Sequence, residues 1–283
     1  MKKFLKRTLK PKEFPFIVVE PGRKLLVLSI TRKMLSSSLE NVQFHHAVLD
    51  IFARHKVLVL RAYKQMFQES LEWVFFVDAS KVEALEELLG SLKALKGVLS
   101  VEWIGPENNV IVDLLHFPMT SRGGVRMIIF SAETLSRVLT ELYKAFGTGA
   151  SFILYKLGFD YGQELSAHFK KMLAAVSGGI ELPPKKVVES FLKYNVSSGW
   201  QVLEAFEVST EGRIEATVRV RELWEALARK GLEMEEVNCD LFRGILAGFF
   251  TNLYGMKFKA VEVACAAKGA PYCEFRIIEQ VKP

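Results

Sequence analysis

The sequence predicts an α/β protein of the α+β class with two domains, and three observations support this fold class. Between residues 24 and 105, apolar runs rich in Val, Ile and Phe alternate with helical patterns in the order strand, helix, strand, strand, helix, strand. The segments "GPENN" and "FPMTSRGG" then punctuate residues 105–124, as is typical of a domain boundary. Beyond them, three helical patterns are followed by two pairs of β-rich runs with a further helix between the pairs.

Each element of the first half has a pattern of its own. The strands are predicted at 24–30, 56–63, 72–79 and 98–104. Serines open the first helical pattern, 36–55, and can cap it. The second helical pattern, 81–97, has apolar residues at helical spacing, acids near its start, lysines near its end and Gly97 as a stop. This order is that of a ferredoxin-like βαββαβ domain, which we assign to residues 24–113.

Residues 1–23 differ from the domain that they precede. The run "FPFIVVEPG", residues 14–22, predicts an additional hairpin strand with its turn at Pro21–Gly22. Six basic residues and no acid stand among the first twelve, whereas the remaining chain is neutral overall. Such a basic arm can bind nucleic acid or an anionic membrane surface, although a solvated terminus is the simpler interpretation.

The composition excludes some classes of protein. No apolar run approaches the roughly 20 residues that a membrane-spanning helix needs. The start "MKKFLKRTLKPK" lacks the long apolar segment of a secretory signal, so we expect a cytoplasmic protein. In a reducing compartment, three cysteines are expected to be free or metal-bound instead of paired in disulfides.

The second half, residues 114–283, predicts helices combined with an antiparallel sheet. Its helical patterns start at Ser131 or Thr134, at Phe152, at Pro183 and at Asp240, and its β-rich runs are 200–208, 213–222, 258–265 and 272–278. The first two runs meet at Gly212, which is typical of a hairpin. Gly244 and Gly248 lie four residues apart on the last helix, so we expect close packing against a neighbouring helix there.

All three cysteines lie near the end of the chain, and Glu262 lies among them. Glu262, Cys265 and Cys273 fall on or beside the last predicted hairpin, and Cys239 begins the helix before it. Three thiolates and a carboxylate can complete a tetrahedral zinc shell. Strand alternation turns positions 262 and 265 to opposite faces, so Cys265 must lie at the strand end or behind a bulge. From the spacing alone, buried cysteines that fill gaps in a core remain the alternative.

Residues 114–283 resemble the 4-vinyl reductase domain family. The resemblance is carried by "FP" at 117–118, by "LYKLGFDYGQEL" and by "C…GILAGFF…VEVACAAKGAPYCEFRI". Relatives in this family include the sensory domains of phenol- and xylene-responsive transcription activators, a bacteriochlorophyll-synthesis protein and vesicle-tethering subunits. The resemblance implies zinc at Cys239, Glu262, Cys265 and Cys273, and four protein ligands imply a structural ion without an open position.

The same resemblance implies a buried chamber for a small hydrophobic or aromatic ligand. Aromatic residues of the second half are the candidate lining, although plain core packing is the alternative for each of them. These candidates are Phe152, Tyr155, Phe159, Tyr161, Trp200, Phe206, Phe249 and Phe250. The first half resembles the ACT family by topology, as in archaeal regulators of amino-acid metabolism, but "TRKMLSSSLEN" replaces the Asp-x-Pro-Gly type turn of ligand-binding members.

Together these observations favour a cytoplasmic, ligand-sensing regulatory protein that acts as a homodimer. No catalytic residues can be assigned, and Gly147–Gly149 joins two helices without the preceding strand that a nucleotide site needs. A reductase-like or tetrapyrrole-related enzyme remains an alternative because of the family's name. A scaffold or tethering subunit is the other alternative.

Overall fold

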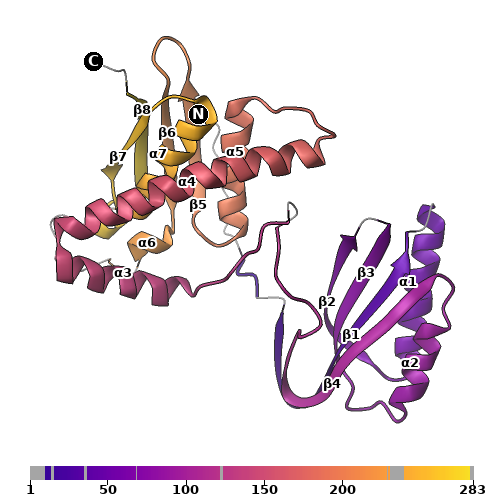
Figure 1. Ribbon diagram of the computed structural model, residues 1–283. Coiled ribbons are helices and arrows are strands. Elements are labelled where there is room, and N and C mark those ends of the chain that lie inside the picture. The colour runs from indigo at the N-terminus through magenta and orange to yellow at the C-terminus, as the bar shows by residue number, and fades with distance from the viewer. Residues whose placement is uncertain are drawn as a thin grey trace. The chain divides into compact units, whose positions relative to one another are not determined.

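The computed structural model of the chain describes residues 10–13, 16–34, 37–67, 69–121, 124–227, 229 and 239–280. The chain divides into two compact units, Lys10–Met119 and Thr120–Pro283. Each unit combines helices with an antiparallel sheet, so the α+β class predicted from the sequence is confirmed (Figure 1). Most of the predicted basic arm, residues 1–9, lies outside the described residues.

The first unit has the predicted strand and helix order. Its elements are β1 (Ile17–Lys33), α1 (Ser38–Arg54), β2 (Leu58–Phe67), β3 (Ser70–Asp78), α2 (Leu85–Lys93) and β4 (Val98–Val112). Among the described residues of this unit, the sheet order is β2-β3-β1-β4, with every neighbouring pair antiparallel. Both helices cover the same face of the sheet (Figure 1).

Local sequence explains both helices. Helix α1 begins after Ser37, whose hydroxyl accepts the Glu40 N–H at 3.1 Å. Helix α2 buries Leu88, Leu89 and Leu92, which recur at helical spacing on the face that packs against the sheet. The amphipathic pattern therefore fixes which side of α2 meets the strands.

The predicted hairpin turn at Pro21–Gly22 is wrong, because β1 continues through these residues. The register of β1 against β4 shifts between Val19 and Lys24, and pairing extends to Ile17 opposite Val112. Gly22 adopts φ 78° at this irregularity, and its N–H donates to the Asn109 side chain at 2.7 Å. Strand β4 is long enough to pair with both halves of β1, so the break is absorbed as a bulge instead of a turn.

The face of the first sheet opposite the helices carries a buried polar network. His116 Nε2 lies 2.8 Å from a Glu72 carboxylate oxygen, and its Nδ1 lies 2.8 Å from Asp113 Oδ2. The Tyr63 hydroxyl donates to the same Asp113 oxygen at 2.5 Å. Burial lowers the pKa of His116, but the hydrogen bonds to the two carboxylates outweigh burial and the net pKa is raised. The network fastens the chain after β4 to the sheet.

The second unit places a long helix and a central helix over an antiparallel sheet. Its elements are α3 (Ala132–Phe146), α4 (Thr148–Val176), α5 (Pro184–Ser197), β5 (Val202–Ser209), β6 (Glu215–Arg221), α6 (Trp224–Leu227), α7 (Asp240–Tyr254), β7 (Phe258–Ala264), the short 3₁₀ helix Ala266–Lys268 and β8 (Cys273–Glu279). In the described part of this unit the strand order is β5-β6-β8-β7. Ser131 caps α3, as expected, by accepting the Thr134 N–H at 3.3 Å.

Glycines on both helices allow α4 and α7 to cross at backbone distance. A Cβ atom at Gly244 would lie 2.2 Å from the Tyr155 carbonyl oxygen, and one at Gly248 would lie 1.9 Å from that of Phe159. Gly158 on α4 faces α7 in the same way, because its Cβ would lie 2.2 Å from the Leu241 carbonyl oxygen. The close packing predicted from Gly244 and Gly248 is confirmed.

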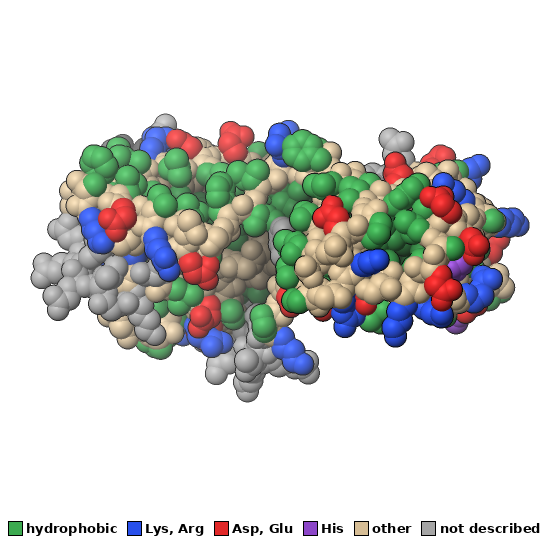
Figure 2. All heavy atoms as spheres, turned by 90° about the horizontal axis from the view of Figure 1, so that it is seen from below, with side chains coloured by type: hydrophobic (Ala, Val, Ile, Leu, Met, Phe, Trp, Pro, Cys, Tyr) green, Lys and Arg blue, Asp and Glu red, His purple; other side chains and the backbone are tan. Residues whose placement is uncertain are grey.

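The surface of the second unit exposes large apolar side chains on α3 and α4. They are Val138, Phe146, Phe152, Ile153, Leu157 and Tyr161. Figure 2 shows hydrophobic side chains at the surface of both units, interspersed with charged side chains of both signs. Within the described residues, no helix is both long and apolar enough to span a bilayer.

Candidate metal centre

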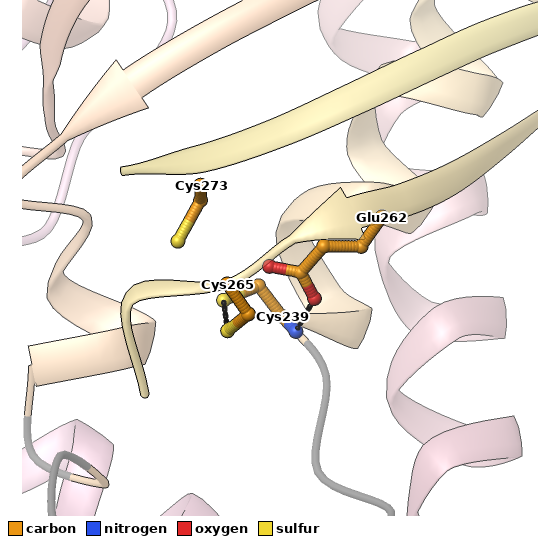
Figure 3. A group of neighbouring side chains, drawn as sticks. All are labelled: Cys239, Glu262, Cys265 and Cys273. Atoms are coloured by element: carbon orange, nitrogen blue, oxygen red, sulfur yellow. Dashed lines mark hydrogen bonds between the residues drawn. The ribbon is translucent and has the colours of Figure 1, made fainter. Parts of the chain in front are cut away.

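The structure brings the three cysteines and Glu262 together. Cys239 is the residue before α7, Glu262 lies on β7, Cys265 directly follows β7 and Cys273 begins β8. One potential ligand atom from each of the four residues lies within 4.8 Å of all the others (Figure 3). The three cysteines are buried and free of disulfides.

The backbone resolves the strand-alternation problem by both expected devices. The register of β7 against β8 shifts between Glu262 and Ala264, which is a bulge or a similar irregularity. Strand β7 also ends at Ala264, so Cys265 is no longer bound by the alternation of the strand. Glu262 and Cys265 can therefore turn toward the same point.

The distances fit a tetrahedral ion. Two thiolates bound at about 2.3 Å to one zinc ion lie about 3.8 Å apart. The Cys239 and Cys265 sulfur atoms lie 3.8 Å apart. Glu262 Oε2 accepts the Cys239 backbone N–H at 2.7 Å, whereas the buried Oε1 has no hydrogen-bond partner in the structure. That orphaned oxygen beside three sulfur atoms is an available metal ligand.

The cluster is electrostatically strained without a cation. Burial raises the pKa of the Cys239 thiol. Burial, followed by the nearby Cys265 charge, raises the pKa of Glu262 to about 8. Hydrogen bonds from Cys239 and Cys273 lower the pKa of Cys265 to about 2. One thiolate is thus favoured at the expense of its neighbours, and a divalent cation would allow all four groups to ionise.

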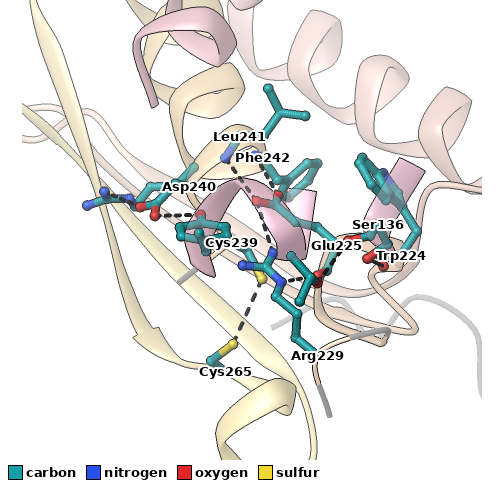
Figure 4. Close-up of polar contacts among 12 residues, drawn as sticks. Ser136, Trp224, Glu225, Arg229, Cys239, Asp240, Leu241, Phe242 and Cys265 are labelled. Atoms are coloured by element: carbon teal, nitrogen blue, oxygen red, sulfur yellow. Dashed lines mark hydrogen bonds and ion pairs between the residues drawn. The ribbon is translucent and has the colours of Figure 1, made fainter. Parts of the chain in front are cut away.

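A buried carboxylate holds the start of α7, where Cys239 lies. Glu225 is fully buried and accepts the backbone N–H groups of Leu241 at 3.0 Å and Phe242 at 2.9 Å (Figure 4). Its carboxylate also pairs with the buried Arg229 at 3.2 Å. Sequence patterns missed Glu225 because α6 is a single turn without periodicity. The carboxylate fixes the helix end that presents Cys239.

The predicted ligand-lining residues separate into two groups. Phe206, Phe249 and Phe250 are buried in the core of the second unit, and Tyr155, Phe159 and Trp200 pack partly buried against it. Phe152 and Tyr161, by contrast, are 72% and 46% exposed. The structure therefore does not place these two in the interior, because Phe152 precedes the crossing with α7 and Tyr161 lies on the flank of α4.

Two further aromatic residues, which sequence reasoning missed, complete the core around Phe249. The Phe191 ring stacks on the Phe249 ring with centroids 4.2 Å apart, and Phe169 lies edge-on to Phe191 at 5.6 Å. The buried side-chain atoms of this unit that have no hydrogen-bond partner in the structure include Ser166 Oγ, Asn195 Nδ2 and Gln201 Oε1. No pattern in one sequence marks these polar atoms, because each stands at an otherwise ordinary helical or loop position.

Comparison with known protein families identifies a 4-vinyl reductase domain in the C-terminal region, matched over residues 223–279. The matched segment contains all four residues of the metal cluster. No curated protein matches this chain. The ACT-like assignment of the first unit stays a prediction.

Several solved structures are similar to the second unit at low identity. The phenol-responsive sensory domain of the transcription activator PoxR, solved with phenol, is 18% identical, with a TM-score of 0.46 over 56% of this chain and 78% of that chain. A trafficking protein particle complex subunit 3 from Naegleria fowleri, covalently bound to palmitic acid, is 15% identical, with a TM-score of 0.40 over 53% and 95%. A vinyl-4-reductase family protein from Methanocaldococcus jannaschii is 18% identical, with a TM-score of 0.29 over 53% and 91%.

Proposed function

We propose that this chain is a cytoplasmic, ligand-sensing regulatory protein whose second unit binds a small apolar molecule and is stabilised by structural zinc. The family match over residues 223–279 and the buried cluster of three cysteines and Glu262 support the zinc part. A reducing cytoplasm keeps the thiols available as ligands. The homodimer predicted from the sequence stays a prediction.

The zinc would act as a structural ion. Four protein ligands fill a tetrahedral shell and leave no position for water or substrate. The ligands come from the start of α7 and from the β7–β8 hairpin, so the ion would tie the central helix to the edge of the sheet. Its binding free energy would therefore add to the folding free energy of this unit.

Two neighbouring glutamates provide a matched test of the zinc part. Glu262→Gln removes a ligand, whereas Glu274→Gln makes the same change on β8, where the native side chain pairs with Arg219 at 2.6 Å outside the cluster. We expect Glu262→Gln to weaken zinc binding by more than about tenfold, the range that even outer-shell substitutions reach. Competition with a chromogenic chelator measures this affinity. Equal zinc affinities of the two variants would contradict the assignment.

One observation carries the ligand part of the proposal: buried polar atoms without partners lie in a core rich in aromatic rings. Ser166 lies on α4 three residues before Phe169, and Asn195 lies on α5 four residues after Phe191. Each polar residue is thus one helical turn from a ring of the core around Phe249. An apolar molecule with one hydroxyl group would satisfy these atoms while it displaces or joins the rings.

Phenol and benzene are suitable probes because they differ by one hydroxyl group. We expect phenol to raise the melting temperature of the second unit more than benzene does, since ligand bound to the folded state stabilises it. Asn195→Leu should remove the preference for phenol, and Val187→Leu, a buried change on the same helix that leaves the polar atoms intact, should retain it. If neither compound binds in native mass spectrometry, the ligand part of the proposal is wrong.

A further inference from the structure

Three basic side chains meet at one end of the first sheet, on the face that the helices cover. They are Arg32 at the end of β1, His45 on α1 and Lys64 on β2, and we call them the cationic cluster. Lys64 Nζ lies 2.6 Å from His45 Nε2 and 4.2 Å from the centroid of the Trp73 ring. Within the described residues, no ion pair joins Arg32 or Lys64 to a carboxylate.

Arg32 is the most unusual member of the cationic cluster. Its side chain is only 2% exposed. Its Nη2 donates to the Asn41 side-chain oxygen, and its guanidinium lies 4.6 Å from the Phe44 ring centroid. The buried Nε and Nη1 have no hydrogen-bond partner in the structure. A buried guanidinium is normally paired with an acid, because desolvated charge and unmade hydrogen bonds are both costly.

The three groups also destabilise one another's charges. Burial lowers the pKa of Arg32. Burial and then the charge of Arg32 lower the pKa of Lys64. Burial, followed by the charges of Lys64 and Arg32, lowers the pKa of His45. A negative group among them would reverse the repulsion and supply the missing acceptors.

We propose that the cationic cluster binds a small oxyanion, the carboxylate or phosphate group of a small molecule. Arg32 supplies buried donors from below, and Lys64, whose side chain is exposed and free to swing, closes over the anion from the solvent side. The N-terminal half of α1, which carries Asn41 and His45, adds the positive end of its dipole.

The burial of Arg32 selects the size of the ligand. Its donors lie behind Lys64 and His45, so only a single small group can reach them. The phosphodiester backbone of a nucleic acid is held at the surface by its own bulk and would contact Lys64 without reaching Arg32. The site is therefore specific for a free anionic group. It lies in the first unit and is independent of the function proposed for the second unit.

Inorganic phosphate and acetate, each titrated into the full chain at constant ionic strength with chloride as the reference, test the proposal. NMR titration of the histidine ring signals reports on the site directly. We expect at least one of the two anions to bind saturably and to raise the pKa of His45, while that of the distant, exposed His55 stays constant. Binding by phosphate alone or by acetate alone identifies the preferred group.

A matched pair of lysine variants separates the site from general charge effects. Lys64→Gln removes the closing cation, whereas Lys93→Gln removes another lysine of this unit, which lies 5.2 Å from the Trp103 ring. Neither side chain is part of a hydrophobic core, so both variants should fold. We expect at least a tenfold weaker anion affinity for Lys64→Gln and an unchanged affinity for Lys93→Gln. Absence of saturable binding by both anions, or equal weakening by both substitutions, would overturn the proposal.

Discussion

The crossing of α4 and α7 makes a sharp prediction for Gly158→Ala. The new Cβ would lie 2.2 Å from the Leu241 carbonyl oxygen and 3.1 Å from the Ile245 backbone nitrogen, whereas ordinary contact begins at 3.4 Å. The obstructing atoms belong to helix backbone and cannot rotate away. The two helices must therefore separate by about 1 Å at this point, with loss of packing along the crossing.

The expected loss of stability follows from two opposing effects. Overpacking a core costs about 1–3 kcal/mol, and the upper end applies because the backbone itself must move. Alanine is favoured over glycine in a helix by about 1 kcal/mol. Gly158→Ala should therefore destabilise the second unit by about 2 kcal/mol.

Urea denaturation of the full chain, combined with hydrogen exchange of peptides from α4 and α7, measures this loss in the correct unit. Gly149→Ala is the matched control on α4, because its Cβ would meet only the Phe146 Cβ, at 3.8 Å. The control should be neutral or slightly stabilising. If Gly158→Ala is as stable as Gly149→Ala, the close crossing of the two helices is wrong.

Three other predictions concern the polar groups. The pKa of His116 is raised on folding, so its contribution is present below its unfolded pKa of about 6.5 and is lost as the pH rises through the folded value; unfolding free energies between pH 5 and 9 should show this loss in the native chain and not in His116→Gln. Glu225→Gln breaks a buried ion pair with Arg229 and should cost about 3 kcal/mol or more in chemical denaturation, with normal stability as the contrary result. Cys273→Ser should release zinc and unfold the second unit, as monitored by circular dichroism, and a folded variant that retains its metal would contradict the structural role.

The sequence predicted features that depend on local pattern. The leucine spacing of α2 and the serine caps of α1 and α3 follow from neighbouring residues in the chain, and the structure has them where expected. The grouping of Cys239 with the last hairpin depended on the family resemblance, because spacing alone could not distinguish ligands from buried core cysteines. The bulge before Ala264 was expected once Glu262 and Cys265 were required to face the same point.

Features that depend on distant contacts could not be predicted. Glu225 caps a helix sixteen residues further along the chain, and nothing near it signals that contact. Pro21–Gly22 has the composition of a turn, but the length of β4, far away in sequence, decides that β1 continues. Arg32 lies at a strand end, where a basic residue is normally solvated, and only the position of α1 buries it.

X-ray absorption at the zinc edge, recorded on the full chain as purified, tests the central claim most directly. We predict one zinc ion per chain with three sulfur ligands at about 2.3 Å and one oxygen ligand at about 2.0 Å, contributed by the cysteines and Glu262. A chain without zinc, or a zinc shell without sulfur, would contradict the account.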